Sequence, residues 1–224
     1  MALPGYEALL EYLAVQESDW MMSPAERLAI VGLLQILRPA RTLEIGYGFG
    51  GSTSRLSAFS GAVVTVDVDA RVKEASTRFP NVAPMHMSSG EALRRLSDER
   101  QRFDLCLVDG DHSEHGAYED LKGAIPLADV LLIHDAANPD CRSGYCRALG
   151  ETDAYADLDF VDGRLQVDGP WGGFGVVLPG LQRNQPRHHT PTVISSFRLL
   201  AAELARRRTF WSRIRRKVCP TRSS

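Results

Sequence analysis

The sequence predicts an α/β protein built on a doubly wound, mostly parallel, seven-stranded sheet. Five short apolar runs alternate with segments of helical pattern, which is the order expected for a parallel sheet covered by helices on both faces. Two further strand-like runs follow with no helix between them, and they predict an antiparallel pair that closes the sheet. With 224 residues, of which 44% are hydrophobic, the chain can bury one substantial core.

Two amphipathic helices are expected before the first strand. Pro4–Val15 carries apolar residues at helical spacing, and a second helix is expected to begin at Ser23-Pro24-Ala25-Glu26 and to run to Leu37. Its start combines an N-cap serine, a proline at the first helical position and a capping-box glutamate. This leader either covers a bound ligand or simply packs on the sheet.

The remaining elements follow from the apolar runs and the turn residues between them. The expected strands are, in chain order, Thr42–Gly46, Ala62–Val68, Val82–His86, Phe103–Val108, Val130–Ile133, Phe160–Val167 and Gly173–Leu178. Helices are expected to start at Ser52 after the first strand and to cover Arg71–Phe79 and Tyr118–Ile125. Residues 1–180 are expected to form the main domain, and residues 181–224 a basic linker and an amphipathic C-terminal helix.

Three alternate glycines follow the first strand, in Glu44-Ile45-Gly46-Tyr47-Gly48-Phe49-Gly50. Glycine accepts positive φ and lets the backbone lie against a ligand. A turn of this kind between a strand and a helix binds small polar ligands through backbone groups. The spacing also satisfies the dinucleotide fingerprint, so an NAD(P)-dependent oxidoreductase is one alternative. Glu44 favours another ligand, because a buried carboxylate beside the turn would favour an ammonium or sulfonium group over a pyrophosphate.

Carboxylates also follow later strands. Asp67 ends the second strand, where it can accept hydrogen bonds from both ribose hydroxyls, and Asp69 is the rival for that role. The fourth strand ends in Asp109-Gly110-Asp111-His112, and the fifth ends in His134-Asp135. Because ligands bind at the carboxyl edge of open α/β sheets, Asp109 and Asp135 are expected to share one rim.

The pattern Glu44-x-Gly46-x-Gly48-x-Gly50 resembles motif I of class I S-adenosylmethionine-dependent methyltransferases. The blocks Leu107–Ser113 and Ile133-His134-Asp135 resemble the small O-methyltransferases related to macrocin and cephalosporin-biosynthesis enzymes, which are cousins of the catechol type. The resemblance covers roughly residues 20–180. It implies a Rossmann-like methyltransferase fold, S-adenosyl-L-methionine as the methyl donor, and O-methylation of a hydroxylated small molecule such as a sugar or a secondary metabolite.

The resemblance also implies a set of site residues. Those expected at the methyl donor are Glu44, Gly46, Tyr47, Gly48, Gly50, Ser52, Asp67, Val68, Ser89, Gly90 and Asp109. In the metal-dependent cousins a divalent ion, usually Mg²⁺, is held by the acids that end strands four and five, which here are Asp109 and Asp135. Ala136 stands where a third ligand is expected, and the substitutes are Asn138, Asp111 and His134.

Two mechanisms follow from these residues. In the first, Asp109 and Asp135 hold Mg²⁺, which lowers the pKa of the acceptor hydroxyl. In the second, no metal takes part, and His112 is the general base, oriented by Asp109 or Asp135. The main alternative that is not an enzyme is a catalytically inactive module, which binds the cofactor and a partner protein.

The charge of the chain is uneven although its net value is only −2. Residues 181–224 hold 11 basic residues and one acidic residue, so this tail is expected to pack on the acidic body or on a second subunit of a homo-oligomer. Contact with an anionic membrane surface is the alternative, and nucleic acid is not expected as a partner. The four cysteines show no metal or disulfide spacing and no secretory signal is visible, so a cytoplasmic location is expected.

Overall fold

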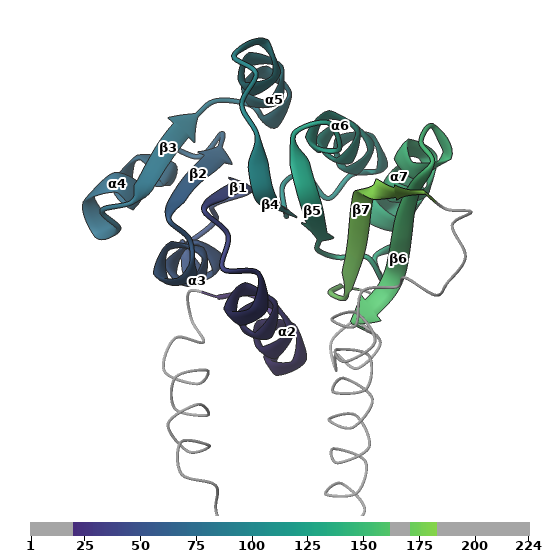
Figure 1. The fold of residues 1–224 in the computed structure, drawn as a ribbon, viewed down its shortest axis with the longest axis horizontal. Helices are drawn as coiled ribbons and strands as arrows, with labels where there is room; N and C mark the ends of the chain where they lie inside the picture. Colours follow the sequence, from purple (N-terminus) through teal and green to yellow (C-terminus); the bar gives the residue numbers. More distant parts are fainter. Residues whose placement is uncertain (1–19, 162–170, 183–224) are drawn as a thin grey trace, which may run out of the picture.

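The computed structural model describes residues 20–161 and 171–182, which form a seven-stranded sheet with helices on both faces (Figure 1). The strand order is β3-β2-β1-β4-β5-β7-β6. The strands are β1 (Arg41–Ile45), β2 (Ala62–Asp67), β3 (Val82–His86), β4 (Phe103–Val108), β5 (Ala128–Ile133), β6 (Ala154–Val161) and β7 (Phe174–Gln182).

The first five strands are parallel, and β7 pairs antiparallel with both β5 and β6. The doubly wound, mostly parallel sheet expected from the sequence is therefore confirmed. Its strand order reverses between β1 and β4, because the chain first builds outwards to β3 and then returns to the other side of β1. In open α/β sheets such a reversal marks the crevice in which ligands bind.

The helices divide between the two faces of the sheet (Figure 1). One face carries α2 (Pro24–Leu37), α3 (Gly51–Phe59), a 3₁₀ turn (Ala70–Glu74) and α4 (Ala75–Arg78), and the other carries α5 (Ser89–Asp98), α6 (Glu114–Ala124) and α7 (Pro139–Gly150). Successive side chains of strand β4 point to opposite faces of the sheet, so this strand contributes to the hydrophobic core on each face. Leu105 and Leu107 pack on the side of α2 and α3, whereas Cys106 and Val108 pack on the side of α6.

Helix α2 starts as the sequence predicts. The Ser23 hydroxyl accepts a hydrogen bond from the Glu26 backbone at 3.4 Å, and the Ser23 backbone donates to Glu26 Oε2 at 2.6 Å, so both halves of the capping box form. Ile30 and Leu34 on its inner face are fully buried. Burial of two such side chains contributes about 3–6 kcal/mol, which is enough to hold α2 against the sheet.

Several element boundaries differ from the sequence-based expectation. Helix α6 begins at Glu114 rather than Tyr118, because the Ser113 hydroxyl caps it by accepting from the Gly116 backbone at 3.0 Å. Strand β6 begins at Ala154, not at residue 160. Helix α7 was not expected at all, although Asn138 caps it and Pro139 occupies its first position, which is a recognisable start signal.

Some expectations fall outside the described residues. These are the helix over Pro4–Val15, the part of the predicted sixth strand after residue 161, the turn residues 168–170, and the linker and basic helix of residues 183–224. Among the residues that are described, none of the helices is both long enough and apolar enough to span a bilayer.

Candidate active site

The glycine turn between β1 and α3 depends on backbone conformations that suit glycine. Gly46, Gly48 and Gly50 have φ values of 93°, 54° and 84°. A Cβ atom on Gly46 would lie 1.9 Å from the backbone oxygen of Asp109, so no other residue fits beneath the end of β4. A Cβ atom on Gly48 would meet nothing within 4 Å, which leaves the turn open toward solvent.

Asp67 is attached directly to this turn. Its Oδ2 accepts hydrogen bonds from the backbone of Tyr47 at 2.8 Å and of Gly48 at 3.1 Å. Asp69, the rival from the sequence, instead forms a 2.6 Å ion pair with Arg71 on the surface. The β1–β2 register explains the difference, since Ile45 pairs with Val66 and Asp67 therefore lies beside the start of the turn.

Glu44 is completely buried and does not line the cavity beside the turn. Its two oxygens accept hydrogen bonds of 2.6–2.7 Å from the hydroxyls of Ser52, Thr53 and Thr65. Burial raises the pKa of Glu44 to about 7 despite these three bonds. The sequence favoured a cationic ligand as the partner of this carboxylate, but in the structure its partners are three hydroxyls of its own chain, two of them at the start of α3.

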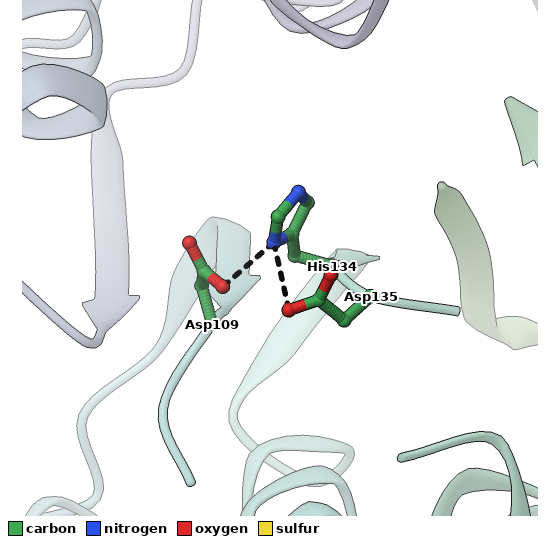
Figure 2. A group of neighbouring side chains, drawn as sticks. All are labelled: Asp109, His134 and Asp135. Atoms are coloured by element: carbon green, nitrogen blue, oxygen red, sulfur yellow. Dashed lines mark hydrogen bonds and ion pairs between the residues drawn. The ribbon is translucent and has the colours of Figure 1, made fainter. Parts of the chain in front are cut away.

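The β4–β5 register brings the acidic residues of the rim together. Val108 pairs with Ile133, so Asp109 and His134 leave neighbouring strands side by side. His134 Nδ1 lies 2.8 Å from Asp109 Oδ1 and 3.5 Å from Asp135 Oδ2, and Figure 2 shows this nitrogen directed at both carboxylates. One ligand atom from each of the three residues lies within 4.8 Å of the other two.

These contacts set the charges of the rim. Burial alone would lower the pKa of His134, but Asp109, Asp135 and Glu26 raise it well above its usual value. Burial would likewise raise the pKa of Asp109, but the two histidines His134 and His112 lower it to about 2. The contacts of the rim therefore favour the ionised form of Asp109 and strengthen proton binding by His134.

His112 approaches the same carboxylates from the mouth of the cavity. Its Nε2 lies 3.1 Å from Asp135 Oδ2 and 3.6 Å from Asp109 Oδ1, and its side chain is 44% exposed. The pKa of His112 is raised by Asp109 and Asp135 against the effect of partial burial. The ring of Trp171 meets the His112 ring edge-on, with 5.6 Å between their centroids.

Asp135 is held in an unusual backbone conformation. Its φ is 53°, a region that costs a non-glycine residue about 1–3 kcal/mol. Its Oδ1 accepts a hydrogen bond from the backbone of Gly172, in the turn that carries Trp171. Strain that persists beside a cavity is typical of a functional position.

Most of these groups line one cavity of about 440 Å³. The glycine turn, the leader segment before α2, the ends of β4 and β5 and the Trp171 turn all contribute. Its lining consists of Trp20, Met21, Met22, Gly46, Tyr47, Gly48, Phe49, Gly51, Ser52, Asp109, His112, His134, Asp135, Trp171 and Gly172.

Not every expected residue reaches this cavity. Gly50, Asp67, Val68, Ser89 and Gly90 are outside its lining. Val68 is 70% exposed, and Ser89 and Gly90 form the start of α5. Asp67 ends β2, Val68 follows it, and Ser89 and Gly90 come after β3, so these four lie on the other side of β1 from β5.

The three substitutes for Ala136 lie in different surroundings. Asn138 caps α7 through its side-chain oxygen, and Asp111 accepts two hydrogen bonds from Ser113. Only His134 joins Asp109 and Asp135. Glu26, Trp20 and Phe49 were not expected at the site. Of these, Glu26 carried a signal as a capping-box residue, but nothing in the sequence connected it to His134.

Comparisons with known proteins agree with this geometry. The family model of a methyltransferase domain matches residues 43–136. No curated protein matches the sequence significantly. Among solved structures, an O-methyltransferase from Bacillus cereus in complex with SAH is similar with a TM-score of 0.56 and 19% identity, over 80% of this chain and 92% of that one.

Two further structures show how widely this fold is used. The O-methyltransferase TomG from Streptomyces achromogenes, involved in tomaymycin synthesis and solved with SAM, has a TM-score of 0.55 and 20% identity, over 76% of this chain and 88% of its own. An rRNA methylase from Streptococcus thermophilus has a TM-score of 0.54 and 15% identity, over 73% of this chain and 100% of its own. At such identities the similarity establishes the fold, and the acceptor has to be argued from the site.

The matched residues run from the second half of β1 to just past Asp135, and so they contain the glycine turn and both acids of the rim. The family model therefore covers the part of the chain that holds the candidate site, and the solved structures share its fold.

Proposed function

We propose that this protein transfers a methyl group from S-adenosyl-L-methionine to an oxygen atom of a small hydroxylated acceptor. The observation that carries the proposal is that the glycine turn and the Asp109–His134–Asp135 rim open into the same cavity. A donor bound at the turn and an acceptor bound at the rim would therefore meet inside one cavity.

The groups around the turn suit the parts of the methyl donor. The open face at Gly48 allows a ligand to contact the backbone, and Asp67, already fixed by that backbone, is the acceptor for ribose hydroxyls. The exposed Val68 beside it offers an apolar surface for the adenine ring. Glu44 stabilises the turn without lining the cavity, because its hydrogen bonds to Ser52 and Thr53 hold the start of α3 against the turn.

His112 is the proposed general base. One of its ring nitrogens faces Asp135, which fixes the orientation of the ring and leaves the other nitrogen to receive a proton. His112 accepts the hydroxyl proton while the oxygen–carbon bond forms and the carbon–sulfur bond breaks, and S-adenosylhomocysteine leaves. General-base catalysis contributes about 10²–10⁴-fold, and orientation of the two reactants contributes about 7–11 kcal/mol.

The rim also has the donor set of a divalent-metal site. Asp109 Oδ1, His134 Nδ1 and Asp135 Oδ2 are close enough to share one ion, with the imidazole replacing the third oxygen ligand that Ala136 lacks. One imidazole with two carboxylates suits Mn²⁺, Fe²⁺ or Zn²⁺ better than Mg²⁺, which prefers oxygen ligands. Such an ion would lower the pKa of the acceptor hydroxyl and so assist His112.

The lining of the cavity indicates the kind of acceptor. Trp20, Met21, Met22, Phe49 and Trp171 supply apolar surface, and the charged groups all lie at the rim. Neither lysine nor arginine occurs among the described lining residues. The cavity therefore suits an uncharged molecule with an apolar body and one hydroxyl better than a free sugar or a phosphorylated metabolite.

Transfer of a radiolabelled methyl group from S-adenosylmethionine tests the proposal. The acceptor panel should pair neutral phenols and alcohols with their phosphate esters, and should include sugars and primary amines. Methylation of a neutral hydroxyl compound is the expected result. Tight binding of the methyl donor with no transfer to any acceptor would favour an inactive binding module, and transfer only to amines would reassign the acceptor atom.

A further inference from the structure

Glu26 connects three parts of the molecule that are distant in sequence. It belongs to the first turn of α2, and its side chain is buried. Its Oε2 accepts a hydrogen bond from the Ser23 backbone at 2.6 Å. Its Oε1 accepts a hydrogen bond from the backbone of Gly173 and lies 3.4 Å from Nε2 of His134. A helix cap, a turn before β7 and a rim residue thus share one carboxylate.

Two of these connections lead to residues that line the cavity. Trp20, Met21 and Met22 precede the cap of α2 and are among these residues. Trp171 is another and precedes Gly172 and Gly173, whose backbone groups donate to Asp135 and Glu26, respectively. The Trp171 turn is therefore held by two carboxylates, one from the rim and one from the leader helix.

The third connection concerns the orientation of His134. Its Nδ1 is bonded to Asp109 at 2.8 Å, whereas its buried Nε2 has no well-aligned hydrogen bond. The carboxylate of Glu26 is at ion-pair distance from that nitrogen. A carboxylate beside the far nitrogen of a functional imidazole fixes both the tautomer and the angle of the ring.

We propose that Glu26 is a positioning residue of the methyl-transfer site, which sets the orientation of His134 and fixes the Trp171 turn relative to the Trp20–Met22 segment. The effect on catalysis rests on the function proposed above. The effect on His134 does not, because it follows from the contacts of Glu26 alone.

The test compares Glu26→Gln with Ser23→Ala in the full-length protein. The glutamine keeps the size of the side chain but has no carboxylate for His134. The alanine removes the hydroxyl half of the same capping box and leaves the Glu26 carboxylate in place. Both variants weaken the start of α2, so a difference between them reports on the rim rather than on helix stability.

Three readouts separate the roles of Glu26. The ¹⁵N chemical shifts of the His134 ring should move in Glu26→Gln and stay in place in Ser23→Ala. For an acceptor identified in the panel, kcat/KM should fall about 10- to 100-fold in Glu26→Gln only. The dissociation constant of S-adenosylhomocysteine should not change in either variant, because the partners of Glu26 described above, Ser23, Gly173 and His134, do not belong to the glycine turn.

Unchanged His134 resonances in a folded Glu26→Gln protein would overturn the proposal, as would equal losses of kcat/KM in the two variants. Should the glutamine variant not fold, Glu26→Asp is measured instead, since it keeps the charge but shortens the reach toward Gly173 and His134. Failure of the proposed function would show differently: the wild-type protein would not bind S-adenosylhomocysteine, while the His134 resonances would still respond to Glu26→Gln.

Discussion

Asp109 and His134 meet at 2.8 Å because the residues before them, Val108 and Ile133, are paired across β4 and β5. Parallel strands that end in register place whatever follows them side by side. Here they place a carboxylate against an imidazole at the edge of a cavity, next to the glycine turn that follows β1. The candidate chemistry of the protein depends on this pairing.

The first prediction concerns Gly46. Gly46→Ala should abolish binding of S-adenosylhomocysteine, because the new Cβ would overlap the Asp109 backbone and push the end of β4 away from the turn. The positive φ alone should cost about 1–3 kcal/mol of stability. Calorimetric titration and thermal unfolding check both effects. Gly150→Ala, at the end of α7, is the control, since its Cβ meets nothing, and an equal loss there would refute the explanation.

A second prediction separates the two acids after β2. Asp67→Asn should raise the dissociation constant of S-adenosylhomocysteine at least tenfold, because the amide offers only one acceptor oxygen for the Tyr47 and Gly48 backbone and the ribose. Asp69→Asn should leave it unchanged, since Asp69 pairs with Arg71 on the surface. The reverse order of affinities would assign the ribose to Asp69.

The third prediction is a pH dependence of transfer. His112 must be neutral to accept a proton, and its pKa is raised above 6.5, so kcat should increase with pH through a value above 6.5. His112→Ala should lower kcat about 10²–10⁴-fold and remove this step from the profile. His115→Ala is the matched control on the exposed side of α6. A profile that keeps its step in His112→Ala would exclude His112 as the base.

The fourth prediction concerns the metal. Mn²⁺ should bind the wild-type protein with one site, measured by calorimetry after treatment with EDTA, and Asp135→Asn should abolish that binding. Asp111→Asn should bind Mn²⁺ normally because Asp111 caps its own loop. Full transfer activity in EDTA would show that His112 acts without the ion.

The fifth prediction concerns stability and Glu44. Its pKa is about 7 in the folded protein and near 4.5 when unfolded, so folding favours the protonated form. That contribution is complete below pH 4.5 and is lost as the pH rises through 7, on the order of 3 kcal/mol. Denaturant unfolding at pH 5 and pH 8 should therefore show a smaller decline for Glu44→Gln than for the wild type. Equal declines would mean that Glu44 stays ionised in the fold.

The sequence predicted those parts of the site that depend on strand ends. The alternation of apolar runs identified the five parallel strands, and parallel strands necessarily bring Asp109 and Asp135 to one edge. What it could not predict depends on register and long-range contact. The Glu26 carboxylate accepts a hydrogen bond from Gly173, 147 residues away in the sequence, and no local sequence pattern predicts that contact.

Glu44 also depends on contacts that the sequence alone does not predict. Its burial was predictable from its place inside an apolar strand, but its partners were not, because Thr65 is brought beside it by the β1–β2 register and Ser52 and Thr53 by the first turn of α3. Helix α7 is a different case. Its Asn-Pro start was present in the sequence and would have identified it.

The most direct test is to compare ligands by calorimetry with the wild-type protein. Methyl transfer at this site requires that S-adenosylhomocysteine bind one site per chain, that Gly46→Ala lose this binding, and that NAD⁺ and NADP⁺ give no heat of binding. Binding of NAD⁺ or NADP⁺ without any binding of S-adenosylhomocysteine would contradict it and assign the glycine turn to a pyrophosphate.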